Sequence, residues 1–359
     1  MPQSVHPAFV SVPPWRAPGK SEDTMGGFEL TSGIAVGLAF GYALQRGRFC
    51  VNTGFRDILM VKDSTMFRAW ALAVIVQMAG VTILSGLDLM PITVPPFWWA
   101  ANIAGGLMFG VGMVLAGGCS SGTCYRVGEG MAGSLVALVG FGLGILLADR
   151  GALQPLQDVL RSNIVFVDGD QATLANVIGI NPLWVGLAIP LAVGIWLWRG
   201  GVGNRQYASG GWAWHISGFA LGAIGIAAWL SSSSVGREFG LSMTGPIRTW
   251  FVLALSGENY LDWGSVMIAG LIVGSFVAAW THRELRWRVP RGSRILQAGG
   301  GGIVMGVGAQ IAGGCNIGHS MTGMSVLSLG SVVTTTSILL GAWMMAYILF
   351  IRPMAAQSA

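Results

Sequence analysis

Residues 105–119 of the chain read GGLMFGVGMVLAGGC, and residues 301–315 read GGIVMGVGAQIAGGC. All the glycines and the closing AGGC fall at the same positions in the two stretches, and every matched pair is 196 residues apart. A fixed offset of this kind indicates an internal duplication. Both stretches are apolar and rich in glycine, as is typical of helices that pack closely inside a bilayer.

The composition places the whole chain in the same environment. Of its 359 residues 53% are hydrophobic and only 10% are charged, whereas a soluble domain has roughly 25% charged residues. A soluble fold is therefore excluded. The net charge of +5 is small and spread over the loops, so it favours an orientation signal over a nucleic-acid site.

Nine segments are apolar over nearly the length of about 20 residues that a membrane-spanning helix needs. They are 31–46, 69–88, 97–117, 131–148, 183–199, 212–230, 264–281, 295–314 and 331–350. The sequence thus predicts an all-α, polytopic protein embedded in the lipid bilayer. Residues 1–30 form a polar tail that lacks the features of a cleavable signal, and residues 31–352 form one transmembrane domain.

Charge in the loops predicts the orientation of the spans. Basic residues gather near 56–68, 199–205 and 283–294, while acidic residues gather in 149–170. Positive loops mark the cytoplasmic side, which places the C-terminus in the cytoplasm. The two copies of the repeat then cross the membrane in opposite directions. We therefore expect two inverted halves, at about 31–199 and 212–352, the construction of many transporters.

Three segments between the spans are too polar and glycine-rich to face lipid: 118–130, 231–248 and 315–330. Backbone at membrane depth must be buried in protein or line a cavity, so we expect re-entrant turns that open into half-helices. The N-terminus of a half-helix points free N–H groups at the interior. N–H groups near Gly118 and Gly314 are thus predicted to offset the charge of an anion.

Three cysteines lie at the ends of these elements, namely Cys50, Cys119 and Cys315. A neutral thiol is a weak hydrogen-bond donor and a soft partner for another sulfur atom, which favours a sulfur-bearing anion as the passenger. Three alternatives stay open at this point. The cysteines could be apolar filler, they could hold zinc although the spacing is poor for it, or Cys119 and Cys315 could form a redox disulfide.

Polar residues beside the cysteines are candidates for supporting roles. Ser120 and Asn316 follow two of them directly. Arg126 and Glu129 are three residues apart, so on a helix they share a face and are predicted to form an ion pair that braces the turn. For His319 two roles are open, donation to the substrate or capping of the second half-helix.

Three separate motifs carry a family resemblance. They are QRGRFC at 45–50 with FRD at 55–57, AGGC at 116–119 with YRVGEG at 125–130, and AGGCNIGH at 312–319. In this order, over about residues 31–352, they resemble the signature segments of the YeeE/YedE family. Cys124 stands outside this pattern and is interpreted as a packing residue.

The resemblance implies an hourglass-shaped helical transporter of the cell inner membrane whose cysteine-bearing loops meet at a narrow waist. It further implies import of thiosulfate by transient S–H hydrogen bonds from one cysteine to the next, which here are Cys50, Cys119 and Cys315. A TusA-like cytoplasmic sulfurtransferase is the soluble partner that the family implies. No metal or other cofactor is predicted, and no Walker A pattern is present.

Two functional alternatives remain beside thiosulfate import. One is a membrane-embedded thiol oxidoreductase that uses Cys119 and Cys315 as its redox pair. The other keeps transport but changes the cargo to another sulfur or selenium compound.

Overall fold

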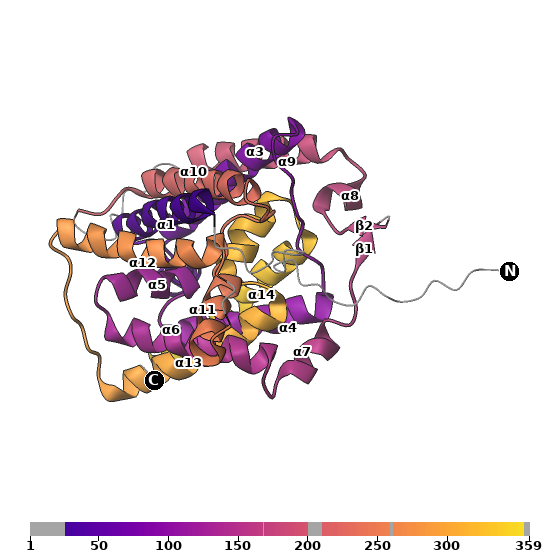
Figure 1. Ribbon diagram of the computed structural model, residues 1–359. Helices are drawn as coiled ribbons and strands as arrows, with labels where there is room; N and C mark the ends of the chain where they lie inside the picture. Colours follow the sequence, from indigo (N-terminus) through magenta and orange to yellow (C-terminus); the bar gives the residue numbers. More distant parts are fainter. Residues whose placement is uncertain (1–25, 168, 200–209, 259–260, 355–359) are drawn as a thin grey trace.

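The computed structural model describes residues 26–167, 169–199, 210–258 and 261–354, and it is almost entirely helical (Figure 1). Within these residues nine helical segments are long and apolar enough to cross a membrane. Their main helices are α1 (Gly27–Gly47), α3 (Thr65–Gly86), α4 (Trp99–Leu115), α6 (Ala132–Asp149), α9 (Pro182–Arg199), α10 (Trp214–Ser233), α12 (Trp263–Thr281), α13 (Gly292–Ala312) and α14 (Leu329–Ala346). Each overlaps one predicted span, which confirms the prediction of an all-α, polytopic membrane protein.

The two copies of the repeat, α4 and α13, pack with their backbones in contact. A methyl group built on Gly105 would lie 2.6 Å from the carbonyl oxygen of Gly308, and one built on Gly308 would lie 2.6 Å from the carbonyl oxygen of Gly105. A methyl group built on Gly112 would lie 2.8 Å from the carbonyl oxygen of Gly301. Because Gly105 corresponds to Gly301 and Gly112 to Gly308, each copy gives the other the contacts that it receives.

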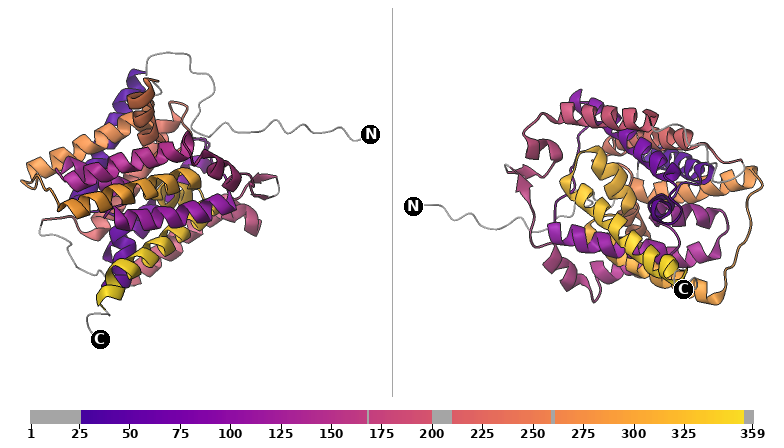
Figure 2. Two further views of the ribbon diagram at one scale, coloured as in Figure 1. Left: turned by 90° about the horizontal axis from the view of Figure 1, so that it is seen from below. Right: turned by 180° about the vertical axis from the view of Figure 1, so that it is seen from behind.

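The contacts among the other long helices also come in matched pairs. Helix α1 packs on α12 while α3 packs on α10, and α4 packs on α14 while α13 packs on α6. Along the chain α1, α3, α4 and α6 are followed by α10, α12, α13 and α14 in the same order. The contact of α1 with α12 therefore matches that of α10 with α3, and the contact of α4 with α14 matches that of α13 with α6. Figure 2 shows many of these helices running in roughly one direction, inclined to each other.

Short helices follow the turns between the spans. They are α2 (Val51–Met60), α5 (Ser120–Gly128), α11 (Thr244–Ser256) and η1 (Ile317–Gly323). Two of them, α5 and η1, lie inside predicted re-entrant segments. The third such segment differs, because its helix α11 starts only at Thr244 and runs on to Ser256. Helix α2 after Cys50 was not predicted. Its sequence is too polar for a span and too short for hydropathy to reveal it.

The predicted acidic loop at 149–182 contains more structure than its polarity indicated. It holds α7 (Gln154–Leu160), α8 (Leu174–Ile178) and an antiparallel hairpin of β1 (Phe166–Val167) with β2 (Asp170–Gln171). Isolated bridges join Val165 to Phe97 and Thr173 to Ser328. The loop is thereby tied to the segments that lead into α4 and α14.

The start of the first span differs from the prediction. Residues 1–25 of the expected tail lie outside the described residues, but Gly27 to Leu30 belong to α1. Glu29 is buried, and its carboxylate accepts a hydrogen bond from the backbone N–H of Trp263 at 3.0 Å. The helix therefore begins earlier than hydropathy indicated. Its early charged residue, Glu29, is accommodated because the carboxylate is hydrogen-bonded to the first residue of α12. Arg205 of the predicted basic loop also lies outside the described residues.

Candidate functional site

Cys50 and Cys119 are in contact deep inside the protein. Their Sγ atoms are 3.6 Å apart, and neither side chain is exposed. Each is the residue immediately before a short helix, α2 for Cys50 and α5 for Cys119. Both thiols are free, so the contact is a thiol–thiol hydrogen bond in which either sulfur can donate.

Glycines shape the turn that holds this pair. Gly117, which follows α4, has a φ of 75°, in the left-handed region that favours glycine. The N–H of Gly122 donates to Cys119 Sγ at 3.4 Å. A methyl group built on Gly122 would lie 2.7 Å from Cys50 Sγ and 3.2 Å from Cys119 Sγ. The absence of a side chain at Gly122 therefore leaves the space that the two sulfur atoms occupy.

Cys315 lies at the corresponding turn after α13. The helix ends at Gly313, whose φ is 84°, and the carbonyl of Cys315 accepts from the N–H of His319 at 2.9 Å. The thiol is buried and free. Among the described residues no hydrogen bond joins it to Cys119, so the thiol contact in this structure is the one between Cys119 and Cys50.

Cys124 is a fourth buried thiol, on α5. It belongs to the same core of buried side chains as Cys119 and Cys315. Sequence reasoning interpreted this residue as a packing residue.

Ser120 and Asn316 link the two cysteine-bearing turns directly. Ser120 Oγ donates to Asn316 Oδ1 at 3.1 Å, and both side chains are fully buried. The amide Nδ2 of Asn316 is buried without a hydrogen-bond partner. A buried donor without a partner is costly, so this atom marks a place where an acceptor would be stabilised.

Arg126 and Glu129 are not ion-pair partners of each other in this structure. Arg126 Nη1 donates to the carbonyl of Gly117 at 2.7 Å, next to Gly118 in the turn. Glu129 pairs instead with Arg48 at 2.5 Å. Helical spacing predicted that the two side chains pair with each other. In the structure Arg126 bonds to the turn before α5, and Glu129 bonds to Arg48 at the end of α1.

A cluster of charges surrounds Glu129. Arg48 also pairs with Glu284 at 2.7 Å, and Gln45 donates to both carboxylates. Burial raises the pKa of Glu129, although Arg48 and Gln45 oppose this effect. The pKa of Glu284 is lowered, because the hydrogen bond from Gln45 and the charges of Arg48 and Arg46 outweigh its desolvation. The cluster joins α1, α5 and the segment after α12.

His319 is fully engaged within the protein. Its Nδ1 lies 3.0 Å from Ser331 Oγ, and its Nε2 lies 3.1 Å from the carbonyl oxygen of Ala312. A methyl group built on Gly314 would lie 3.0 Å from the imidazole ring. Both ring nitrogens therefore contact the long helices α13 and α14, and these contacts are not a cap on η1.

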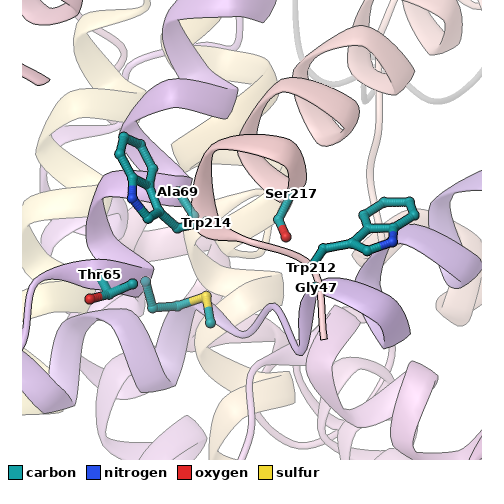
Figure 3. Close-up of a pocket in the computed structure, with 7 residues that line it drawn as sticks. Gly47, Thr65, Ala69, Trp212, Trp214 and Ser217 are labelled. Carbon is teal, nitrogen blue, oxygen red and sulfur yellow. The ribbon is translucent and has the colours of Figure 1, made fainter. Parts of the chain in front are cut away.

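A small pocket lies near the Cys50 turn, between the end of α1 and the start of α10. Figure 3 shows Trp212 and Trp214 on either side of the segment that leads into α10, with Ser217 between them. Gly47 and Thr65 complete this part of the lining. The indole Nε1 of Trp214 is buried without a partner.

Metal ligation finds no support in the described part of the chain. No group of three or more histidine, cysteine, aspartate or glutamate side chains there is placed to hold a metal ion. The polar groups brought together are thiols, a serine and an asparagine, which form neutral hydrogen bonds.

Apolar spans that enclose polar, glycine-rich turns define a class of protein, the multi-pass membrane transporters. Comparison with known proteins agrees, because a family model described as sulphur transport matches residues 46–344. The chain belongs to this sulphur transport family, which includes YeeE and YedE, as the motifs predicted. Membership in a transport family also supports the expected class, a transporter and not an enzyme.

Three relatives are similar to the chain over different lengths. The thiosulfate transporter TsuA of Spirochaeta thermophila is 37% identical over 333 residues, which cover 89% of this chain and 99% of that protein. TsuA of Escherichia coli is 31% identical over 344 residues, covering 90% and 96%. The probable transporter YedE of Escherichia coli is 35% identical over 101 residues, covering 27% and 24%.

Proposed function

We propose that the chain imports thiosulfate across the cell inner membrane by a relay of the three cysteines, in which Cys315 and Cys119 precede Cys50. The observation that carries the proposal is the buried hydrogen bond between the free thiols of Cys50 and Cys119. It occurs in a chain whose two full-length relatives are named thiosulfate transporters. A thiol that already hydrogen-bonds to another sulfur can exchange that partner for the terminal sulfur of thiosulfate.

Each step of this passage is a weak, reversible contact. A neutral thiol donates its S–H to the soft terminal sulfur atom and forms no covalent bond. A permeating ion must bind firmly enough to enter and loosely enough to leave, and a neutral hydrogen bond of about 1 kcal/mol satisfies both conditions. The cysteines stay reduced throughout, so the passage needs neither an oxidant nor a cofactor.

The oxygen atoms of the ion need donors too. Asn316 Nδ2 is a buried donor without a partner, beside Cys315 in the chain. Backbone N–H groups near Gly118 and Gly314 would offset the negative charge at the two turns. Ser120 supports the site by fixing the Asn316 side chain through its hydrogen bond to Oδ1.

We assign the basic loops and the C-terminus to the cytoplasmic side. Two inverted halves, 31–199 and 212–352, would then meet at a waist between two mouths, as in an hourglass. The matched packing of α1 on α12 and of α3 on α10 supports this division. The Cys50 turn would face the cytoplasm, where a TusA-like sulfurtransferase is the proposed acceptor of the imported ion.

Growth on thiosulfate as the sole sulfur source tests the proposal. The strain lacks its own routes of sulfate and thiosulfate uptake and carries either this chain or an empty vector. We expect growth only with the chain, together with uptake of radiolabelled thiosulfate. Growth on sulfide that depends on the chain would indicate sulfide as the transported compound. A selenium compound that inhibits labelled uptake more strongly than unlabelled thiosulfate does would indicate that compound instead. No uptake of any of these ions would contradict the proposal.

A further inference from the structure

The segment before α11 corresponds to the Cys50 turn in the other half of the molecule. The order α1, α2, α3 is followed later by α10, α11, α12, with a short helix in the middle both times. The packing agrees, because α2 contacts α3 and α14, while α11 contacts α12 and α6. Met243 is the residue immediately before α11, as Cys50 is immediately before α2, and Ser242 precedes Met243 in the same turn.

Within this turn, Ser242 is the residue whose side chain corresponds to Cys50 by its contact with the neighbouring turn. Gly122 and Gly318 are 196 residues apart, the offset that relates Cys119 to Cys315. A methyl group built on Gly122 would meet Cys50 Sγ at 2.7 Å, and one built on Gly318 would meet Ser242 Oγ at 3.9 Å. Ser242 thus faces the Cys315 turn as Cys50 faces the Cys119 turn.

The surroundings of Gly318 are more open than those of Gly122. Apart from its own backbone neighbourhood, Ser242 Oγ is the one atom of the described chain within 4 Å of the added methyl group, whereas three atoms crowd the equivalent position at Gly122. An ion that accepts a hydrogen bond from the Ser242 hydroxyl group needs such open space beside it.

Two buried polar atoms lack a hydrogen-bond partner in this region. One belongs to Thr244, two residues after Ser242, and the other to Asn316, next to Cys315 in the chain. Thr244 is 5% exposed and its Oγ1 has no hydrogen-bond partner, and the same holds for Nδ2 of the fully buried Asn316. Such atoms are rare in native proteins unless a water molecule or a ligand satisfies them.

We propose that Ser242 is a fourth binding residue of the passage, donating its Oγ–H to an oxygen atom of thiosulfate at the end opposite to Cys50. This inference rests on the proposed function. A hydroxyl group donates more strongly to oxygen than a thiol does, so Ser242 suits the oxyanion end of the ion, and the thiols suit its sulfur end. The ion would meet Ser242 and Cys315 on one side of the Ser120–Asn316 contact, and Cys119 and Cys50 on the other.

Uptake of labelled thiosulfate by Ser242→Ala tests this role. We expect uptake at low thiosulfate concentration to fall about fivefold, the effect of losing one neutral hydrogen bond, chiefly through a higher KM. Ser242→Cys should keep most of the uptake, because a thiol can replace the donor. Ser234→Ala is the matched control, since this exposed serine at the end of α10 donates to the Ser231 carbonyl in its own turn. Ser242→Ala uptake equal to that of the control would overturn the proposal.

A second pair of variants covers the case in which Ser242→Ala does not reach the membrane in folded form. Ser242→Thr and Ser242→Val have nearly the same shape and differ in the hydroxyl group. Higher uptake by the threonine variant supports the proposal, and equal uptake by the two contradicts it. If the unaltered chain carries no thiosulfate, both proposals fall together; if it does, a null result at Ser242 removes this inference alone.

Discussion

Ser120 and Asn316 hydrogen-bond to each other although they occupy the same position in the two repeats, 196 residues apart. Two equivalent residues can touch only where the axis that relates the repeats passes between them. The turns that carry Cys119 and Cys315 therefore meet at this axis. An ion that crosses the contact leaves one repeat and enters the other.

Loss of the Asn316 amide should impair transport more than loss of the Ser120 hydroxyl. Asn316→Ala removes the unpartnered donor Nδ2, so we expect about fivefold lower thiosulfate uptake. Ser120→Ala leaves that donor in place and should cost less than twofold. A double-mutant cycle of thermal unfolding should give a coupling of about 1 kcal/mol between the two side chains. Equal uptake by the two single variants would argue against a role for Nδ2.

Each of the three relay cysteines should be required for uptake. Cys50→Ala, Cys119→Ala and Cys315→Ala each remove one donor, and we expect uptake to fall at least about fivefold in each variant. The measurement is labelled uptake, normalised to the amount of protein in the membrane.

Cys124→Ala is the matched control for these variants, because it removes a buried thiol outside the relay. Its uptake should stay within twofold of the unaltered chain. A chain that tolerates Cys50→Ala but not Cys119→Ala or Cys315→Ala would point to a two-cysteine redox enzyme instead.

Gly122→Ala tests whether the position of the sulfur atoms matters. The new methyl group would lie 2.7 Å from Cys50 Sγ, so the thiols must move apart. We expect uptake to fall while the protein still inserts into the membrane. Gly300→Ala, at an exposed helical position with no atom of the described chain within 4 Å of the added group, should transport normally. Normal uptake by Gly122→Ala would show that the thiol contact is not needed.

The packing of α4 on α13 predicts that alanine lowers the thermal stability at Gly308 but not at Gly300. Gly308→Ala would place a methyl group 2.6 Å from the carbonyl oxygen of Gly105, and overpacking of this kind costs about 1–3 kcal/mol. Gly300→Ala in the same helix should be neutral or slightly stabilising, because alanine favours helix more than glycine does. Thermal unfolding in detergent compares the two, and equal midpoints would contradict the close packing.

The two carboxylates around Arg48 should titrate on opposite sides of their ordinary value of 4.5. Burial raises the pKa of Glu129, so its protonation as the pH falls towards 4.5 favours the folded state. The pKa of Glu284 is lowered, so its contribution to stability is present above 4.5 and is lost as the pH falls through its lowered pKa. Infrared titration of the protonated carboxyl groups, with Glu129→Gln and Glu284→Gln, assigns each step. If Glu129→Gln removed only the titration step at the lower pH, the assignment of the two carboxyl groups would be reversed.

The sequence predicted the membrane-spanning helices and the two glycine-rich turns, because both follow from local composition. Nine spans were found because apolar helices are required across a bilayer, and the turns at Cys119 and Cys315 were found because the repeat marks them. The partner of Glu129 was missed, since Arg48 is near it only after α1 and α5 pack together. Ser242 was not singled out, because its segment matches the Cys50 turn in helix order and not in residue type.

The glycine contacts between α4 and α13 limit how the protein can move. Where backbones touch without intervening side chains, neither helix can slide or tilt without collision, because packed interiors deform little. Rocking of one half against the other, the usual form of alternating access, would have to break this seam. We therefore expect the short turns that carry Cys50, Cys119 and Cys315 to move more readily than these two helices.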